Sequence, residues 1–224
     1  MYVLRVPPAK PTDAAAILAV LSAPRASTYI SAVGGDAAKA MALYGWNARI
    51  AAALMLPSHF AEISTRNAVD EALTAVYGPR WPWNQTFEQS LPSPKGPIYN
   101  PQFDLTQTRS REQSTGKVVA ELKFSFWQAM FTARHDVRIW EHQILSLFPN
   151  ATQDTAKALR KQIRDDLEAI RKLRNRIAHH EPIFARDLAD DLARMLDLVD
   201  LRSTATGQWV RQMEEASNII TQRP

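Results

Sequence analysis

Apolar residues recur at helical spacing along most of the chain, and no segment alternates apolar and polar residues as a half-buried strand does. The pattern predicts a first helical block over about 12–56, with breaks expected at Pro24 and at Gly34-Gly35. A second helix is predicted over 58–77, where Ser58 is a suitable N-cap. We expect this second helix to bury Phe60, Ile63, Leu73, Val76 and Tyr77.

The segment 78–113 breaks this helical pattern. Six of the fourteen prolines of the chain lie here, at positions 79, 82, 92, 94, 97 and 101, so the sequence predicts one long loop inserted between helices. Its aromatic and basic side chains could stack bases and contact phosphates. Alternatively the tryptophans pin the loop to the protein surface, and this is the interpretation we favour for Arg80, Trp81, Trp83, Arg109 and Arg111.

The remaining sequence again has helical periodicity. Helices are predicted over about 114–131, 135–148, 152–180, 184–201 and 204–220. Residues 1–224 are therefore expected to form one all-α domain, a helical bundle with the proline-rich loop 78–113 inserted and the C-terminal helices of 184–224 packed on it. We expect His59, His135 and His142 to be surface or capping residues.

The composition excludes several kinds of site and bears on where the protein is located. The chain has no cysteine, which excludes disulfides, thiol nucleophiles and cysteine zinc sites, and its net charge is +4. The apolar run Ala14–Ala23 has Asp13 at its edge, so it is better interpreted as a helix capped by Thr12 or Asp13 than as a secretory signal. No stretch approaches the roughly 18 apolar residues of a membrane span. We expect an untargeted, cytoplasmic chain with no membrane partner.

The predicted helix 152–180 has a regular apolar stripe of Leu159, Ile163, Leu167, Ile170, Leu173 and Ile177. At about 100° per residue, His180 continues this stripe, whereas Arg171, Arg174, Asn175 and His179 lie on the opposite face. Helical geometry therefore predicts that His180 packs against the core and that His179 is available for chemistry.

Arginine, asparagine and histidine on one face suit the cleavage of RNA, because the ribose 2′-hydroxyl is an internal nucleophile. His179 could transfer protons near neutral pH, and Arg174 could bind the phosphate and stabilise its transition-state charge. A solvated basic end of a helix is the alternative interpretation of the same residues. Neighbouring cations that could attract a polyanion are Arg171, Lys172 and Arg176, with Lys161 and Arg164 further along the helix.

The pair His179-His180 followed by Glu181 also raises the question of a metal site. Adjacent histidines diverge by about 100° on a helix, and the HExxH arrangement of metalloproteases is absent. We therefore expect no metal and no cofactor.

The run Arg174-Asn175-Arg176-Ile177-Ala178-His179-His180-Glu181-Pro182-Ile183 resembles the signature of the Abi-like (abortive infection) family in the HEPN superfamily. That signature is an arginine, usually a polar residue, and a histidine after four to six intervening positions, so its spacing fits either His179 or His180. Resemblance extends over about 21–210, in the same order. It includes Leu21-Ser22 with Arg25 and Tyr29, Leu43-Tyr44-Gly45-Trp46-Asn47, Glu62 with Arg66-Asn67, Tyr77-Gly78 with Trp81, Lys117–Leu122 with Phe126-Trp127, and Phe148-Pro149-Asn150.

The resemblance implies a HEPN-like helical bundle and a metal-independent endoribonuclease of phage defence or a toxin–antitoxin system. Arg174 and Asn175 would be catalytic together with one of the two histidines, and the helical geometry above selects His179. His180, Glu62, Arg66 and Asn67 would support them. Glu62 and Arg66 either orient the active-site side chains or form a solvated salt-bridge ladder with Asp70. RNA would be the substrate, and a protein or RNA antitoxin or inhibitor is a possible partner.

Two further expectations follow. One chain supplies one copy of the motif, whereas RNA cleavage works best with proton-transfer groups on both sides of the phosphate. We therefore predict a twofold homodimer in which the motifs of both chains face one cleft. The alternative to the enzyme is a non-catalytic HEPN-fold module that binds RNA or protein, because a fold does not determine a function.

Overall fold

The computed structural model describes residues 14–224, which form helices and connecting segments with no strand among them. The all-α prediction is confirmed, while the expected caps Thr12 and Asp13 lie outside the described residues. The chain begins with α1 (Ala14–Leu21) and α2 (Ala23–Ala32). Within the described range, no helix is both long enough and apolar enough to span a bilayer.

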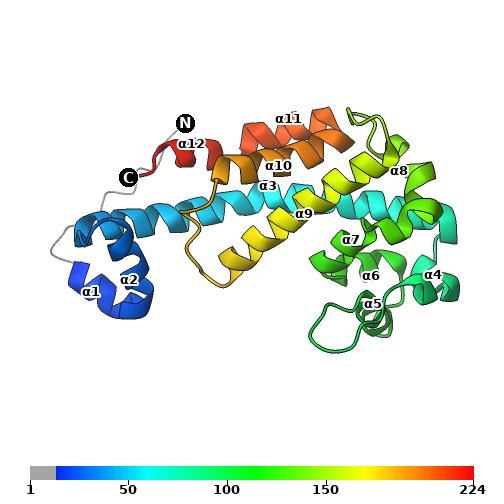
Figure 1. Ribbon diagram of the computed structural model, residues 1–224, viewed down its shortest axis with the longest axis horizontal. Helices are drawn as coiled ribbons and strands as arrows, with labels where there is room; N and C mark the ends of the chain where they lie inside the picture. The colour runs from blue at the N-terminus through cyan, green and yellow to red at the C-terminus, as the bar shows by residue number, and fades with distance from the viewer. Residues whose placement is uncertain (1–13) are drawn as a thin grey trace.

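The longest element is α3 (Ala37–Tyr77), a helix of 41 residues that runs along most of the molecule (Figure 1). At 1.5 Å per residue it is about 60 Å long. The Asp36 carboxylate accepts a hydrogen bond from the Lys39 amide and caps its start. Gly78, with φ of 83°, ends it in a conformation that glycine adopts readily.

The expected break before Ser58 is wrong, because α3 continues through Pro57. Proline has no N–H for the helix and usually breaks or kinks it. Here Pro57 and Ser58 are both buried, so the packing of the two halves of α3 against the core outweighs the lost hydrogen bond. Ser58 is consequently an interior residue rather than an N-cap.

The buried face predicted for the second half of α3 is confirmed in part, since Phe60, Ile63 and Tyr77 are partly buried. Only Leu73 of the five expected residues is fully buried, and Val76 is 39% exposed. The buried positions are instead mostly small residues, which allow α9 and α10 to approach the backbone of α3 closely: Ala61, Thr65, Ala68 and Ala72.

Residues 78–113 do not form one long loop. They contain the 3₁₀-helix η2 (Trp81–Trp83), α4 (Gln85–Ser90) and α5 (Pro101–Arg109). Pro101 occupies the first turn of α5, where the missing N–H costs no hydrogen bond. Prolines therefore start elements here instead of preventing them, which the sequence pattern did not reveal.

The tryptophans anchor this segment, as favoured from the sequence. Trp81 is fully buried, and its indole N–H donates to the Asp70 carboxylate at 2.7 Å. Arg80 stacks over the Trp83 ring at 4.6 Å, and Arg109 donates to the Pro82 carbonyl at 2.8 Å. These side chains hold the fold together, so we assign them no role in binding RNA.

The helix expected over 114–131 is two helices, α6 (Thr115–Glu121) and α7 (Phe124–Met130), separated by extended residues Leu122 and Lys123. The chain continues through the 3₁₀-helix η3 (Ala133–His135), the π-helix η4 (Asp136–Trp140) and α8 (Glu141–Leu147). His135 is only 2% exposed, so its prediction as a surface residue is wrong, whereas His59 and His142 are exposed.

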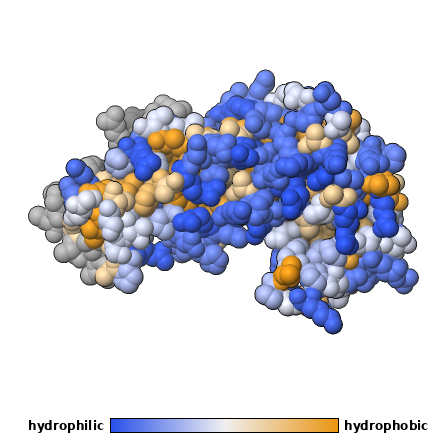
Figure 2. All heavy atoms as spheres, viewed as in Figure 1, coloured by the Kyte–Doolittle hydropathy of each residue, from blue (hydrophilic) through white to orange (hydrophobic). Residues whose placement is uncertain are grey.

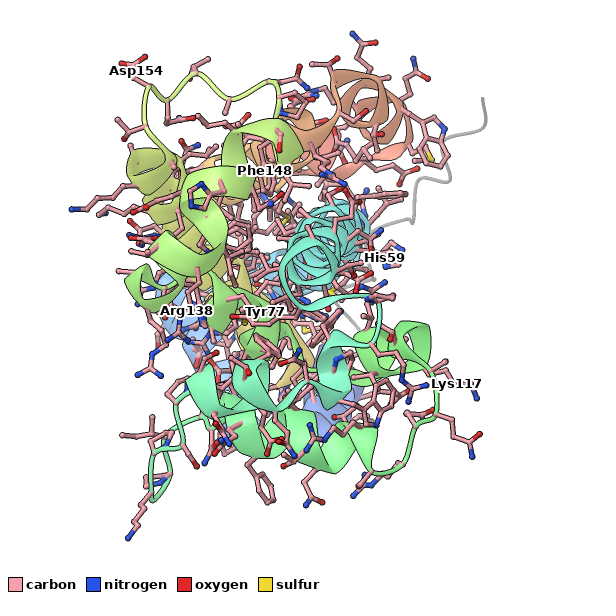
Figure 3. All side chains as sticks on the ribbon, turned by 90° about the vertical axis from the view of Figure 1, so that its right-hand side faces the viewer. His59, Tyr77, Lys117, Arg138, Phe148 and Asp154 are labelled. Atoms are coloured by element: carbon pink, nitrogen blue, oxygen red, sulfur yellow. The ribbon has the colours of Figure 1, made fainter. Side chains whose placement is uncertain are left out.

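The last four helices are α9 (Ala156–Ala178), α10 (Leu188–Arg202), α11 (Thr204–Met213) and α12 (Ala216–Thr221). Figure 1 shows α9 crossing α3 obliquely while α10–α12 lie along α3. The helices α1 and α2 lie at one end of α3, and α4–α7 lie at the other end. In the end-on view of Figure 3, Asp154, just before α9, and Lys117 of α6 lie at opposite edges.

Candidate functional site

The helix α9 has the buried stripe that its sequence predicts. Leu159, Ile163, Leu167, Ile170 and Leu173 are at most 1% exposed, and Ile177 is partly buried. The Thr155 hydroxyl accepts a hydrogen bond from the Ala158 amide and caps the helix start. The outer face carries the basic residues, and hydrophilic residues dominate the middle of this side of the molecule (Figure 2).

The helix ends earlier than predicted, at Ala178, and this changes the environment of both histidines. The His180 amide donates to the Ile177 carbonyl at 3.0 Å and the Glu181 amide donates to the Arg176 carbonyl at 2.8 Å. With His180 at φ of 55°, this pattern is a Schellman motif that turns the chain out of the helix. Both histidines are exposed, so the prediction that His180 packs against the core is wrong.

The residues after the motif form a firmly held turn, residues 179–184. Arg25 of α2 donates to the His180 carbonyl at 2.8 Å. Arg176 donates to the Pro182 carbonyl from Nη2 at 2.7 Å and lies 3.6 Å from the Glu181 carboxylate. These contacts tie the turn to α2 and to the last turn of α9, so Arg176 stabilises the turn.

Asn47 of α3 anchors the end of the same turn. Its buried side-chain oxygen accepts hydrogen bonds from the amides of Ile183 at 2.8 Å and Phe184 at 3.1 Å. Tyr29 of α2 packs against Phe184 with ring centroids 5.2 Å apart. Burial, with the nearby Tyr44 phenol, raises the pKa of Tyr29 to about 12, so its ring packs as a neutral phenol.

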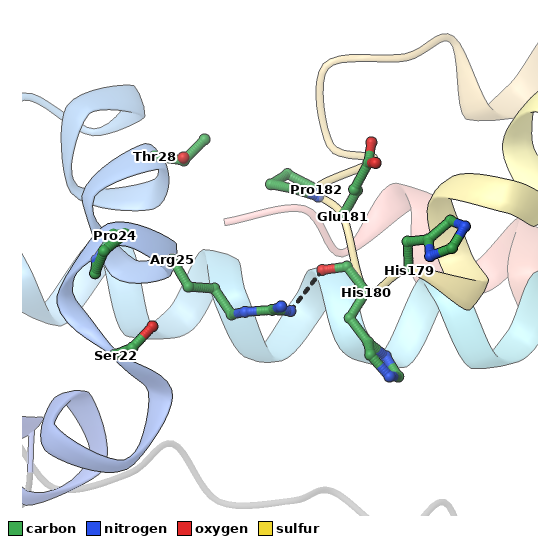
Figure 4. A pocket seen from close by; sticks show the side chains of 8 residues that line it. All are labelled: Ser22, Pro24, Arg25, Thr28, His179, His180, Glu181 and Pro182. Carbon is green, nitrogen blue, oxygen red and sulfur yellow. Dashed lines mark hydrogen bonds between the residues drawn. The ribbon is translucent and has the colours of Figure 1, made fainter.

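A pocket of about 320 Å³ lies between α2 and the 179–184 turn, as Figure 4 shows. Arg25 reaches across it to the main chain of His180, and the imidazoles of His179 and His180 point in different directions. The rest of the lining is polar or small: Ser22, Pro24, Thr28, Glu181 and Pro182.

Arg174 faces a different set of neighbours. Its guanidinium lies 3.0 Å from the Glu62 carboxylate of α3 and 4.9 Å from the centre of the Phe124 ring of α7. Its side chain remains 29% exposed. Glu62 therefore orients Arg174, and the alternative ladder is not formed because Asp70 pairs with Trp81.

The other expected supporting residues have less defined roles. The Arg66 Nε atom is buried without a hydrogen-bond partner, and Asn67 is exposed. Asn175 is exposed as well, so its amide is accessible on the outer face of α9.

Arg171 and Lys172 are paired with Glu168 on the same helix, at 3.0 Å and 3.3 Å. Gln128 of α7 also donates to this carboxylate. Burial alone would raise the pKa of Glu168, but the hydrogen bonds from Gln128, Arg171 and Lys172 outweigh it and lower the pKa. The charge of Glu168 partly neutralises these two expected substrate-binding cations, although Lys172 is 62% exposed.

The structure thus places the histidines of the motif in other surroundings than its arginine and asparagine. His179 and His180 line the pocket beside α2, whereas Arg174 and Asn175 are not among its lining residues. Three residues without a role assigned from the sequence complete the arrangement: Arg25 and Asn47 hold the turn, and Phe124 supports Arg174. Arg25 and Asn47 lie in segments that carry the family resemblance, but Phe124 gave no signal of its own.

Among residues 14–224, no group of three histidine, aspartate or glutamate side chains is arranged to hold a metal ion. No protein-family model matches the chain, and no curated protein or solved structure is significantly similar to it.

Proposed function

We propose that this protein is a HEPN-type, metal-independent endoribonuclease that acts in phage defence or as a toxin. One observation carries the proposal: the turn after α9 is fixed by hydrogen bonds from α2, α3 and α9, yet it leaves the imidazoles of His179 and His180 exposed. Exposed proton-transfer groups on a preorganised turn, beside a basic helix, are what RNA cleavage requires.

In the proposed reaction the ribose 2′-oxygen attacks the adjacent phosphorus, and the bond from phosphorus to the 5′-oxygen breaks. One histidine accepts the 2′-hydroxyl proton, and another donates a proton to the leaving 5′-oxygen. Arg174 stabilises the added negative charge, and Glu62 and Phe124 hold its guanidinium in place. The products carry 2′,3′-cyclic phosphate and 5′-hydroxyl ends.

The division of the motif fits a site shared by two chains. Within one chain Arg174 contacts Glu62 of α3 and Phe124 of α7, while His179 is among the lining residues of the pocket beside α2. We propose a twofold dimer in which Arg174, Asn175 and His179 of both chains meet across one cleft. Sedimentation at assay concentrations should give a dimer, and a monomer that still cuts RNA would rule out the shared site.

The chemistry is tested with purified protein, cellular RNA and an oligonucleotide that contains one cleavable site. Cleavage should persist in excess EDTA and stop when the site carries a 2′-deoxyribose. His179→Ala should lower the rate by roughly a hundred- to ten-thousand-fold. His142→Ala removes an exposed histidine of α8 and should leave the rate unchanged.

Cleavage that chelation abolishes and a divalent ion restores would refute the mechanism. RNA binding without cleavage would instead identify a non-catalytic binding module, in which the Glu62–Arg174 pair serves only packing. Induced expression separates these outcomes in cells, because an active ribonuclease should arrest growth and His179→Ala should relieve the arrest.

A further inference from the structure

The pocket beside α2 contains unusual backbone at two places. In the part of the chain that the structure describes, the non-glycine residues with positive φ are Ser22, at 68°, and His180, at 55°, and both line this pocket. Such conformations are unfavourable for residues with a Cβ, and they persist where surrounding contacts impose them, often at functional sites. Glycine would relieve the strain at either position, but it would remove a side chain that lines the pocket.

The charge of the pocket suits an anion. Arg25 is exposed and donates one N–H to the His180 carbonyl, which leaves other guanidinium donors for a ligand. No described carboxylate forms an ion pair with Arg25, and the acidic lining residue Glu181 pairs with Arg176 at 3.6 Å. His179 is also among the residues that line the pocket.

The size and the remaining lining define the kind of anion. A volume of about 320 Å³ lies at the lower end of the roughly 300–1,000 Å³ typical of small-ligand sites, so it fits one nucleotide rather than a folded RNA element. Pro24 and Pro182 offer apolar surface for a base or sugar. Ser22 and Thr28 offer hydroxyls that can donate or accept hydrogen bonds.

We propose that this pocket binds a single nucleotide of the substrate next to the cleaved bond, with the phosphate on Arg25. The inference rests on the proposed ribonuclease function and makes α2 the second wall of its active site. Arg25 then has two roles, because its bond to the His180 carbonyl positions the turn that carries His179.

The direct test is calorimetric titration of the full-length protein with adenosine 3′-monophosphate and, separately, inorganic phosphate. The nucleotide should bind, and phosphate should bind at least tenfold more weakly because it lacks the sugar and base contacts. Arg25→Ala should weaken nucleotide binding by roughly 10- to 100-fold, the effect expected for a charged hydrogen-bonding partner. Arg25→Lys should retain part of the affinity.

Two pairs of variants separate this role from a general effect on folding. Arg49→Ala removes an arginine beside a different pocket, between α3 and α11–α12, and should leave the affinity unchanged. Thr28→Glu places a carboxylate on the pocket wall and should abolish nucleotide binding. Ser31→Glu adds the same charge to α2 outside the lining and should not. Equal melting temperatures of the two glutamate variants would show that the fold is intact.

Failure of this inference is distinguishable from failure of the proposed function. If RNA is cleaved but the nucleotide does not bind, or binds Arg25→Ala and wild type equally, the pocket assignment is wrong while the enzyme stands. If the nucleotide binds through Arg25 but RNA is not cleaved, the ribonuclease proposal is wrong. In an active enzyme, Arg25→Ala should raise KM more than it lowers kcat.

Discussion

His180 occupies the position of a Schellman motif that glycine usually takes. A left-handed conformation costs a residue with a Cβ about 1–2 kcal/mol, and here the surrounding hydrogen bonds offset it. At position 180 glycine would suit the backbone better, whereas the proposed site needs the imidazole. This is also the residue whose burial the helical periodicity predicted wrongly.

Replacing His180 by glycine should expose this conflict. His180→Gly should stabilise the fold by about 0.5–1 kcal/mol, or roughly 1–4 °C in Tm, because glycine adopts positive φ without strain. The same change should weaken nucleotide binding and cleavage. His179→Gly is the matched control: at φ of −90° it relieves no strain and should not raise Tm. A lower Tm for His180→Gly would contradict the argument.

The buried imidazole of His135 should make the stability of the protein depend on pH. Burial, with the nearby Arg134 and Arg138, lowers its pKa from 6.5 to about 4, although Asp136 opposes the shift. The folded protein thus binds fewer protons than the unfolded chain between these pKa values. This contribution to stability, at most roughly 3 kcal/mol, is complete above pH 6.5 and is lost as the pH falls to about 4.

The measurement is urea denaturation between pH 4 and pH 8 for wild type and His135→Gln. The wild type should lose more stability than the variant on acidification, because glutamine does not titrate. Parallel pH profiles would show that His135 is protonated in the fold at its ordinary pKa.

The helix α3 contains a buried hydroxyl without a hydrogen bond at Ser58, the residue that the sequence predicted to begin a helix. The Ser58 hydroxyl is buried and has no hydrogen-bond partner. Ser58→Ala should therefore stabilise the protein by about 1 kcal/mol, since the variant removes a polar atom that loses water without compensation.

The control lies two turns away on the same helix. The Thr65 hydroxyl is equally buried but donates to the Ala61 carbonyl at 2.8 Å, so Thr65→Val should be neutral or destabilising. Urea denaturation of both variants makes the comparison. Destabilisation by Ser58→Ala would mean that the hydroxyl has a partner in solution.

The same elements show what the sequence could predict. The stripe of α9 was predictable because large apolar residues repeat regularly, and the burial of Leu173 confirms it. The environment of His180 was not, because periodicity gives the direction of a residue only while the helix continues. The sequence also did not predict that α3 continues through Pro57, because that depends on packing against helices distant in the sequence. The small residues of α3 that are buried in this packing, such as Ala68, carry little hydrophobic signal.

The contacts of the candidate site could also be predicted only in part. The sequence leaves two alternatives for Glu62, an orienting role or a salt-bridge ladder with Arg66 and Asp70. The ion pair of Glu62 with Arg174, between α3 and α9, favours the orienting role. The bond from Arg25 to His180 joins residues 155 positions apart, so only the fold could reveal it.

Across the whole molecule, α9 presents a line of cations that leads to the motif. Lys161 and Arg164 are exposed and share one carboxylate, Asp165. The double variant Lys161→Glu/Arg164→Glu should weaken RNA binding and reduce the slope of log K against log salt by about 0.7 for each lost phosphate contact.

Fluorescence anisotropy at several salt concentrations measures this slope. The matched control is Lys95→Glu/Lys117→Glu, which changes the net charge equally and alters exposed lysines outside α9. Equal loss of affinity in both double variants would show that overall charge, rather than the α9 surface, attracts RNA.

The unbroken course of α3 also constrains how the protein can vary in length. Asn47, which anchors the turn, and Glu62, which anchors Arg174, are fifteen residues apart on α3, or about 22 Å. Deleting one residue between them would rotate one anchor by about 100° relative to the other and move it by about 1.5 Å. We therefore expect this stretch to accept substitutions but no insertions or deletions, whereas the exposed segment 95–98 can change length without disturbing either anchor.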